Sequence, residues 1–90
     1  MEYCFICGKR PGTDTHHLIN GNGKRELCDE DGLTIEVCRE CHTWIHNNAK
    51  AEHLCKAIGQ YRYQGIMMQK GETLESAREL FRKRYGKNFA

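Results

Sequence analysis

The sequence predicts a small α+β domain, in which a zinc ion holds a two-stranded hairpin and a helix together and a helical extension follows. Three observations predict this fold. Two C-x-x-C pairs, beginning at Cys4 and Cys38, are separated by 30 residues. A segment that alternates apolar and polar residues directly precedes the second pair. From residue 50 onward, apolar side chains recur at helical spacing.

The length of the chain sets the scale of its core. Its 90 residues fit one domain, and such a small domain buries only a modest fraction of its surface. With 39% hydrophobic residues, apolar burial alone would give little stability, and a structural metal is a common remedy. We therefore expect a single domain over 1–90, with the zinc knuckle and hairpin core in 1–49 and a basic helical extension in 50–90.

The charge is divided unevenly along the chain. Residues 1–49 contain five Lys or Arg and eight Asp or Glu, a net charge of −3, whereas residues 50–90 contain nine and four, a net charge of +5. A basic tail suits a polyanion such as nucleic acid, although an ordinary solvated helix face would have a similar composition.

We expect neither a membrane span nor a signal peptide. Its uncharged stretches are too short to cross a bilayer, and its first residues lack a basic start followed by an apolar run. We therefore expect a cytoplasmic protein without membrane contact. Cytoplasmic thiols stay reduced, which favours metal ions over disulfides as partners of the Cys pairs.

Turn residues and alternation define the first elements. Residues 3–12 predict a zinc knuckle because glycine and proline follow the first Cys pair. Residues 13–19 are expected to form a short strand, on which the neighbours His16 and His17 point to opposite faces. The stretch 20–23, Asn-Gly-Asn-Gly, indicates a turn.

The rest of the hairpin core follows. Residues 24–32 are expected to form a polar loop, and residues 33–37 alternate as a strand does. A helix is expected over 39–47. On this helix His42 and His46 would lie on one face, because they are four residues apart.

Two further helices are expected in the extension. The first covers 50–64, and glycines bracket a connection over 65–71. Thr73 is the expected N-cap of the second, over 74–85, and Gly86 its C-terminal stop. The expected apolar stripes are Ala51, Leu54, Cys55, Ile58 and Tyr61 on the first helix, and Leu74, Ala77, Leu80, Phe81 and Tyr85 (or Arg84) on the second.

Four thiols are the most specific feature of the sequence. Two C-x-x-C pairs fit one tetrahedral thiolate site, which would tie the N-terminus to the hairpin. Cys28 and Cys55 lack partners at useful spacing and are expected to be small buried apolar residues. The predicted ligands of a structural zinc are Cys4, Cys7, Cys38 and Cys41.

The histidines form a second group. His16 from the first strand, with His42 and His46 from the helix, would make a three-histidine site with open positions, which can polarise a phosphate oxygen and stabilise a departing 3′ oxygen. His17 would then be free to take a proton from water. Taken alone, any one histidine is better explained as a surface or core residue, and His53 is expected at the surface.

These motifs resemble the HNH endonucleases, also called ββα-metal or His-Me finger nucleases. Residues 15–18, Thr-His-His-Leu, look like the first strand of that family. Residues 33–38 look like its second strand and residues 41–46 like the start of its metal helix. Many members also carry two Cys pairs around a structural zinc. The similarity covers residues 4–46, about half the chain, and is greatest to small stand-alone HNH proteins of phages and prophages. If a phage encodes the protein, we expect it in the cytoplasm of the bacterial host.

The resemblance implies a ββα-metal fold and a metal-dependent endonuclease that hydrolyses DNA phosphodiester bonds, leaving a 5′ phosphate and a 3′ hydroxyl. It implies that His17 is the general base. It also implies that His16, His42 and His46 hold a catalytic Mn²⁺, Ni²⁺, Zn²⁺ or Mg²⁺ ion, beside the structural Zn²⁺. Ligation by imidazoles alone favours the transition metals over Mg²⁺.

One position departs from the family pattern. The middle Asn of the family motif would fall near the start of the second strand, where this chain has Asp29-Glu30-Asp31-Gly32. Asp31 could take its role as a catalytic residue by accepting a hydrogen bond from His17. The alternatives are that Asn20 or Asn22 takes the role, or that no residue does.

DNA is the expected partner, with low sequence specificity because no base-reading motif is visible. The last helix is expected chiefly to pack on the core or on a second subunit, which leaves a homodimer or a phage protein partner open. The second class of function is a non-catalytic zinc module that binds DNA or protein on a decayed HNH fold; the intact histidines favour the enzyme. Basic residues expected to contact phosphates are Lys24, Arg25, Arg39, Arg82 and Lys83.

Overall fold

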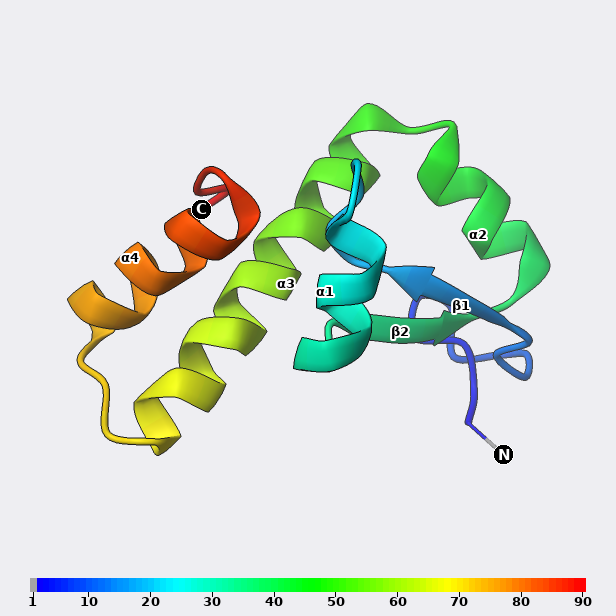
Figure 1. Cartoon of the computed structure of the whole chain (residues 1–90). Coiled ribbons are helices and arrows are strands. Elements are labelled where there is room, and N and C mark those ends of the chain that lie inside the picture. Colours follow the sequence, from blue (N-terminus) through cyan, green and yellow to red (C-terminus); the bar gives the residue numbers. More distant parts are fainter. Residues whose placement is uncertain (1) are drawn as a thin grey trace.

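The computed structural model describes residues 2–90 and contains, within that range, a two-stranded sheet and four helices (Figure 1). The α+β class is the one the sequence predicts. In chain order the elements are β1 (Asp14–His17), α1 (Lys24–Asp31), β2 (Thr34–Val37), α2 (Arg39–His46), α3 (Ala49–Gln69) and α4 (Leu74–Tyr85).

The hairpin places one histidine inside the protein and the next at its surface. β1 and β2 pair antiparallel, with His16 opposite Ile35. Side chains alternate along β1, so that His16 is 4% exposed while His17 is half-buried. The Leu18 amide donates to the Leu33 carbonyl at 3.0 Å and extends the pairing beyond the strands.

The N-terminal segment lies along β2. The Phe5 amide donates to the Glu36 carbonyl at 2.8 Å, and the Thr13 amide donates to the Val37 carbonyl at 3.0 Å. Gly12 permits this close approach, because a Cβ at that position would lie 2.7 Å from Cβ of Glu36. The first Cys pair is thereby held next to the end of β2.

The polar loop expected over 24–32 is wrong, because these residues form α1. The helix starts after Gly23 and ends at Gly32, and both glycines have left-handed backbone conformations, with φ of 75° and 71°. It buries only Cys28 completely, so its eight residues show no apolar period. Packing against β1 and contacts with α4 hold it in place.

α2 begins at the second Cys pair, as predicted. Cys38 caps the helix, since its sulfur accepts a hydrogen bond from the Cys41 amide at 3.5 Å. Within the helix, the side chain of Ile45 is fully buried in the core, whereas His46 is exposed. The helix therefore lies across β1 with its last histidine at the surface.

α3 differs from the prediction in length and in its buried face. The expected break at Gly65 is wrong: Gly65 lies at the surface, and the helix continues unbroken to Gln69. Leu54 and Tyr61 of the expected stripe are 60% and 63% exposed. Ala51 and Cys55 of the stripe are buried as expected, and Ile58 is partly buried against the core. The other buried residues of the helix, which lie outside the expected stripe, are Gly59, Gln60, Tyr63 and Gln64.

Gly59 brings the buried face of α3 close to the core. A Cβ at this position would lie 3.1 Å from Cβ of Leu18 and 3.0 Å from Cδ1 of Ile19. The absence of a side chain lets α3 lie close against the end of β1, which carries the histidines.

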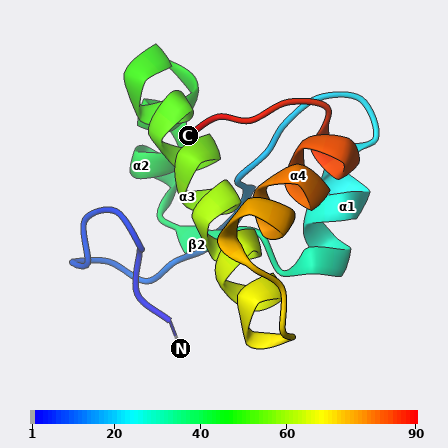
Figure 2. The ribbon, with the colours of Figure 1, turned by 90° about the vertical axis from the view of Figure 1, so that its left-hand side faces the viewer.

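α4 closes the fold as expected from Thr73 to Gly86. Thr73 and Ser76 form a capping box, and Gly86 ends the helix with φ of 95°. Figure 2 shows α4 beside α3 and next to α1. Ala77, Phe81 and Tyr85 are buried as predicted, but Leu74 and Leu80 are exposed. No helix within residues 2–90 has both the length and the apolar character of a membrane span.

Candidate metal centres

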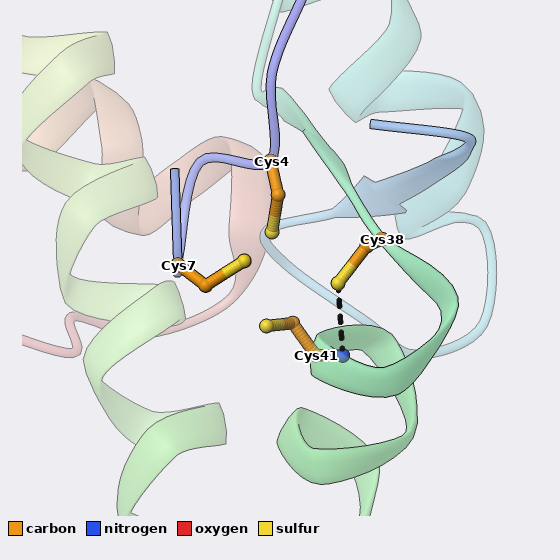
Figure 3. A group of neighbouring side chains, drawn as sticks. All are labelled: Cys4, Cys7, Cys38 and Cys41. Carbon is orange, nitrogen blue, oxygen red and sulfur yellow. Dashed lines mark hydrogen bonds between the residues drawn. The ribbon is translucent and has the colours of Figure 1, made fainter. Parts of the chain in front are cut away.

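The four predicted thiols converge on one point. Cys4 and Cys7 come from the N-terminal turn, and Cys38 and Cys41 from the start of α2 (Figure 3). Their sulfur atoms all lie within 4.8 Å of one another. In a tetrahedral zinc site with Zn–S bonds of about 2.3 Å, the sulfurs are about 3.8 Å apart. Small side-chain rotations therefore suffice for these cysteines to hold a zinc ion.

The pKa values of two of the thiols are shifted in opposite directions. Burial acts to raise the pKa of the Cys4 thiol, but hydrogen bonds from the backbone of Cys7, Cys38 and Ile6 outweigh it and lower the pKa to about 6. Burial, together with hydrogen bonds to the neighbouring thiols, raises the pKa of Cys41 to about 12. Four thiolates would need a cation between them, which a divalent metal could provide.

Three histidines form a second cluster. His16 extends from β1, and His42 and His46 extend from α2 one helical turn apart. One ring nitrogen from each lies within 4.8 Å of the other two. The Nε2 atoms of His42 and His46 are 3.1 Å apart. Two nitrogens about 2.1 Å from one metal, at tetrahedral or octahedral angles, lie about 3.0–3.4 Å apart, so the pair fits.

The buried member of this cluster has no hydrogen-bond partner. Nε2 of His16 is inaccessible to solvent and unpaired among residues 2–90. Leaving such an atom unsatisfied costs about 1–3 kcal/mol. Burial, and then the nearby His42 and His46, lower the pKa of His16 to about 4, so its ring is neutral at physiological pH. A neutral imidazole with an unpaired nitrogen, packed against two further imidazoles, fits a metal ligand.

A carboxylate holds the middle histidine. Oδ2 of Asp14 lies 3.0 Å from Nδ1 of His42 and 2.7 Å from Nε of Arg39. The hydrogen bond with His42 and then that with Arg39 lower the pKa of Asp14, so this side chain is a carboxylate and the His42 ring donates to it. Nε2 of His42 is therefore the nitrogen left for the cluster.

An open pocket of about 260 Å³ gives access to the histidine cluster. His17 borders it together with all three histidines of the cluster. The other lining residues are Thr15, Ile19, Asn20, Gly21 and Arg25. A phosphate-sized group in the pocket would therefore meet both the cluster and His17.

The acidic partner of His17 is not the predicted one. Nε2 of His17 lies 2.8 Å from Oδ1 of Asp29. Asp31, predicted as the hydrogen-bond acceptor for His17, instead accepts from Nε of Arg84 and from the Tyr85 hydroxyl, both at 2.6 Å. Residues two apart on a helix are rotated by about 200°, so Asp29 and Asp31 point in nearly opposite directions. Only Asp29 points toward the hairpin. The alternative residue Asn20 donates to Glu52 instead.

Two of the predicted phosphate contacts lie at the site. Arg25 borders the pocket and has no ion-pair partner within the described residues. Arg39 contacts Asp14 through Nε, but its side chain is 80% exposed. Both guanidinium groups can therefore reach an anion that enters from solvent.

The other three lie away from the pocket lining. Arg82 and Lys83 belong to α4, which Figure 1 shows on the far side of α3 from α2, and Arg82 pairs with Glu79. Lys24, at the start of α1, extends toward Gly86, with Nζ 3.9 Å from the position of a Cβ there. The structure thus separates the predicted basic set into two groups.

The remaining cysteines and the fifth histidine are as predicted. Cys28 and Cys55 are 0% and 2% exposed, and burial raises the pKa of both thiols. His53 is exposed on α3. None of the three belongs to the two clusters found among the described residues.

Sequence reasoning missed Asp14 and Asp29. Asp14 precedes His16 by two residues, and this spacing puts both on one face of a strand, so its place was open to prediction. Asp29 required α1 to be recognised as a helix. The flanking Gly23 and Gly32 were the available indication.

The fold and the two clusters define a small α+β protein with a closed thiol site and an open imidazole site. Residues 1–60 match the family described as "Protein of unknown function (DUF968)", and the chain belongs to this family. The matched segment contains all seven clustered side chains. Comparisons with curated proteins and with solved structures found no significant match.

Proposed function

We propose that this protein is a metal-dependent endonuclease that hydrolyses DNA phosphodiester bonds, built on a ββα-metal core of the HNH type. One observation carries the proposal: His16, whose buried Nε2 has no hydrogen-bond partner within residues 2–90, lies with His42 and His46 around the pocket that His17 also borders. A site that only binds DNA needs no convergent imidazoles with open positions beside them.

The imidazole site would hold the working metal. His16, His42 and His46 supply three neutral nitrogens, which favour transition metals such as Mn²⁺, Ni²⁺ or Zn²⁺ over Mg²⁺. When bound, the ion supplies Lewis-acid stabilisation of the charge that develops on the phosphate and the departing oxygen.

His17 is suited to the role of general base. Its Nε2–H donates to the Asp29 carboxylate, which leaves the lone pair on Nδ1 free to accept a proton. A water molecule attacks phosphorus and gives one proton to Nδ1, while the bond between phosphorus and the 3′ oxygen breaks. The 3′ oxygen then takes up a proton from solvent, so the products are a 5′ phosphate and a 3′ hydroxyl.

The thiol site and the basic residues have supporting roles. Cys4, Cys7, Cys38 and Cys41 would hold a structural zinc that fixes the start of α2. Arg25, at the pocket, and Arg39, beside it, would contact backbone phosphates. Contacts of this kind carry no sequence information, so we expect low sequence preference.

A nicking assay with supercoiled plasmid tests the proposal. Purified protein with added Mn²⁺, Ni²⁺ or Mg²⁺ should nick the plasmid, and His17→Ala should lower the rate by about 10²–10⁴-fold, because it removes the general base. The matched control is His53→Ala, since His53 is exposed on α3 and lies outside both clusters.

Zinc content and folding should be the same in both variants. If the wild type is inert with every metal, or if His17→Ala cuts as fast as His53→Ala, the endonuclease proposal is wrong. A DNA-binding signal without cutting would then favour a non-catalytic zinc module on the same fold.

A further inference from the structure

Asp14 lies between the hairpin and the metal-binding face of α2. It opens β1 two residues before His16, so the two side chains leave the same face of the strand. Its Oδ2 receives hydrogen bonds from Nδ1 of His42 at 3.0 Å and from Nε of Arg39 at 2.7 Å. The Asp14 side chain is only 14% exposed, so water competes little for this oxygen.

We propose that Asp14 is a positioning residue for the imidazole metal site, an inference that rests on the proposed function. Its carboxylate fixes the tautomer of His42 with the proton on Nδ1 and holds the ring so that Nε2 faces His46, 3.1 Å away. Such a partner on the far nitrogen of a ligating histidine orients the ring and strengthens it as a ligand.

The arrangement also balances charge. Three imidazoles are neutral ligands, so a divalent ion bound to them keeps its full charge. Asp14 contributes a carboxylate one imidazole ring away from that ion. Arg39 shares the same oxygen, but its side chain is 80% exposed and solvent screens its charge.

A purely structural role for Asp14 predicts something different. The residue lies near the first turn of α2, where a carboxylate stabilises a helix whether or not a metal binds. Substitution would then lower the stability of the protein and leave its metal affinity unchanged. Metal affinity, measured on folded and zinc-loaded protein, therefore separates the two roles.

The experiment is calorimetric titration of zinc-loaded protein with Ni²⁺, comparing wild type with Asp14→Asn and Asp14→Ala. We expect the Ni²⁺ affinity to fall by about 10- to 100-fold in Asp14→Ala and by less in Asp14→Asn, whose amide oxygen still accepts a hydrogen bond. The matched control is Glu40→Gln, which removes a carboxylate that pairs with Arg10 on the exposed side of α2.

The possible outcomes separate this inference from the proposed function. If wild type takes up Ni²⁺ but both Asp14 variants and Glu40→Gln bind it equally well, the positioning role is wrong and the imidazole site stands. If wild type takes up no Ni²⁺ beyond its zinc, the imidazole site and the proposed function fail together. Asp14→Asn keeps the shape of the side chain, so the Ni²⁺ affinity of this variant still tests the positioning role if Asp14→Ala does not fold.

Discussion

At the scale of single residues, direction around a helix decides which acidic side chain serves His17. Asp29 and Asp31 are equally acidic and two positions apart, yet Asp29 contacts His17 while Asp31 contacts Arg84 and Tyr85. The Asp29 side chain is 64% exposed, so water can partly take its place when it is removed.

Asp29→Ala should therefore lower the cutting rate by about tenfold, the low end of the range for such partners and less than His17→Ala. The Ni²⁺ affinity should not change, because the hydrogen bond of Asp29 goes to His17, which lies outside the imidazole cluster. The control is Glu26→Gln, on an exposed position of α1. Equal nicking rates for Asp29→Ala and wild type would remove Asp29 from the site.

The sequence predicts which side chains come together where their spacing along the chain alone places them close to one another. The two C-x-x-C pairs and the pair His42 and His46 are local patterns, and their members meet as predicted. The place of Asp14 could have been predicted from its spacing to His16, but that of Asp29 could not, because it depends on which way α1 faces. Asp31 was assigned to His17 for the same reason, since a loop gives its side chains no defined direction.

At the scale of elements, the helix whose apolar residues recur at helical spacing is predicted correctly, and the helix without such a pattern is missed. α4 carries Ala77, Phe81 and Tyr85 on one buried face, and its bounds agree with the sequence. α1 buries only Cys28 and shows no such period. The end of α3 was misplaced because Gly65 lies at the surface, where a glycine inside a helix costs only about 1 kcal/mol.

α1 depends on α4 for its position. The Tyr85 hydroxyl is buried and donates to Oδ2 of Asp31 at 2.6 Å, and burial raises the pKa of Tyr85. Tyr85→Phe removes this donor and should lower the free energy of unfolding by about 1.5 kcal/mol, as expected for a hydrogen bond to a charged group.

Urea denaturation of the zinc-loaded protein measures this change. Tyr61→Phe is the matched control, since Tyr61 is 63% exposed on α3 and should be neutral when changed. A loss for Tyr85→Phe no greater than for Tyr61→Phe would mean that α4 does not hold α1 through this bond.

At the scale of the whole molecule, α2 links the two clusters, so that the imidazole site should depend on the thiol site. Cys41 and His42 are neighbours on this helix and point about 100° apart, so α2 lies between the thiol site and the imidazole site. The thiols tie the first turn of α2 to the N-terminal segment. The same helix then supplies two of the three imidazoles.

This dependence should run in one direction. Zinc binding contributes about 10–16 kcal/mol of apparent free energy in small zinc domains, comparable to the whole stability of an ordinary domain of about 5–15 kcal/mol. Cys4→Ser should therefore lose the zinc, lower the Tm and abolish Ni²⁺ binding at the histidines. His46→Ala should lose Ni²⁺ binding alone, with zinc content and Tm kept, because His46 is exposed at the end of α2.

Zinc content by atomic absorption, Tm by circular dichroism and Ni²⁺ affinity by calorimetry on the same samples test this order. Cys55→Ala is the control for changing a buried cysteine, and it should keep one zinc per chain because Cys55 lies outside the thiol cluster. Retention of Ni²⁺ affinity in zinc-free Cys4→Ser would show that α2 holds its histidines without the thiol site. The two centres would then be independent, and the first pair of cysteines would have no part in positioning the second metal.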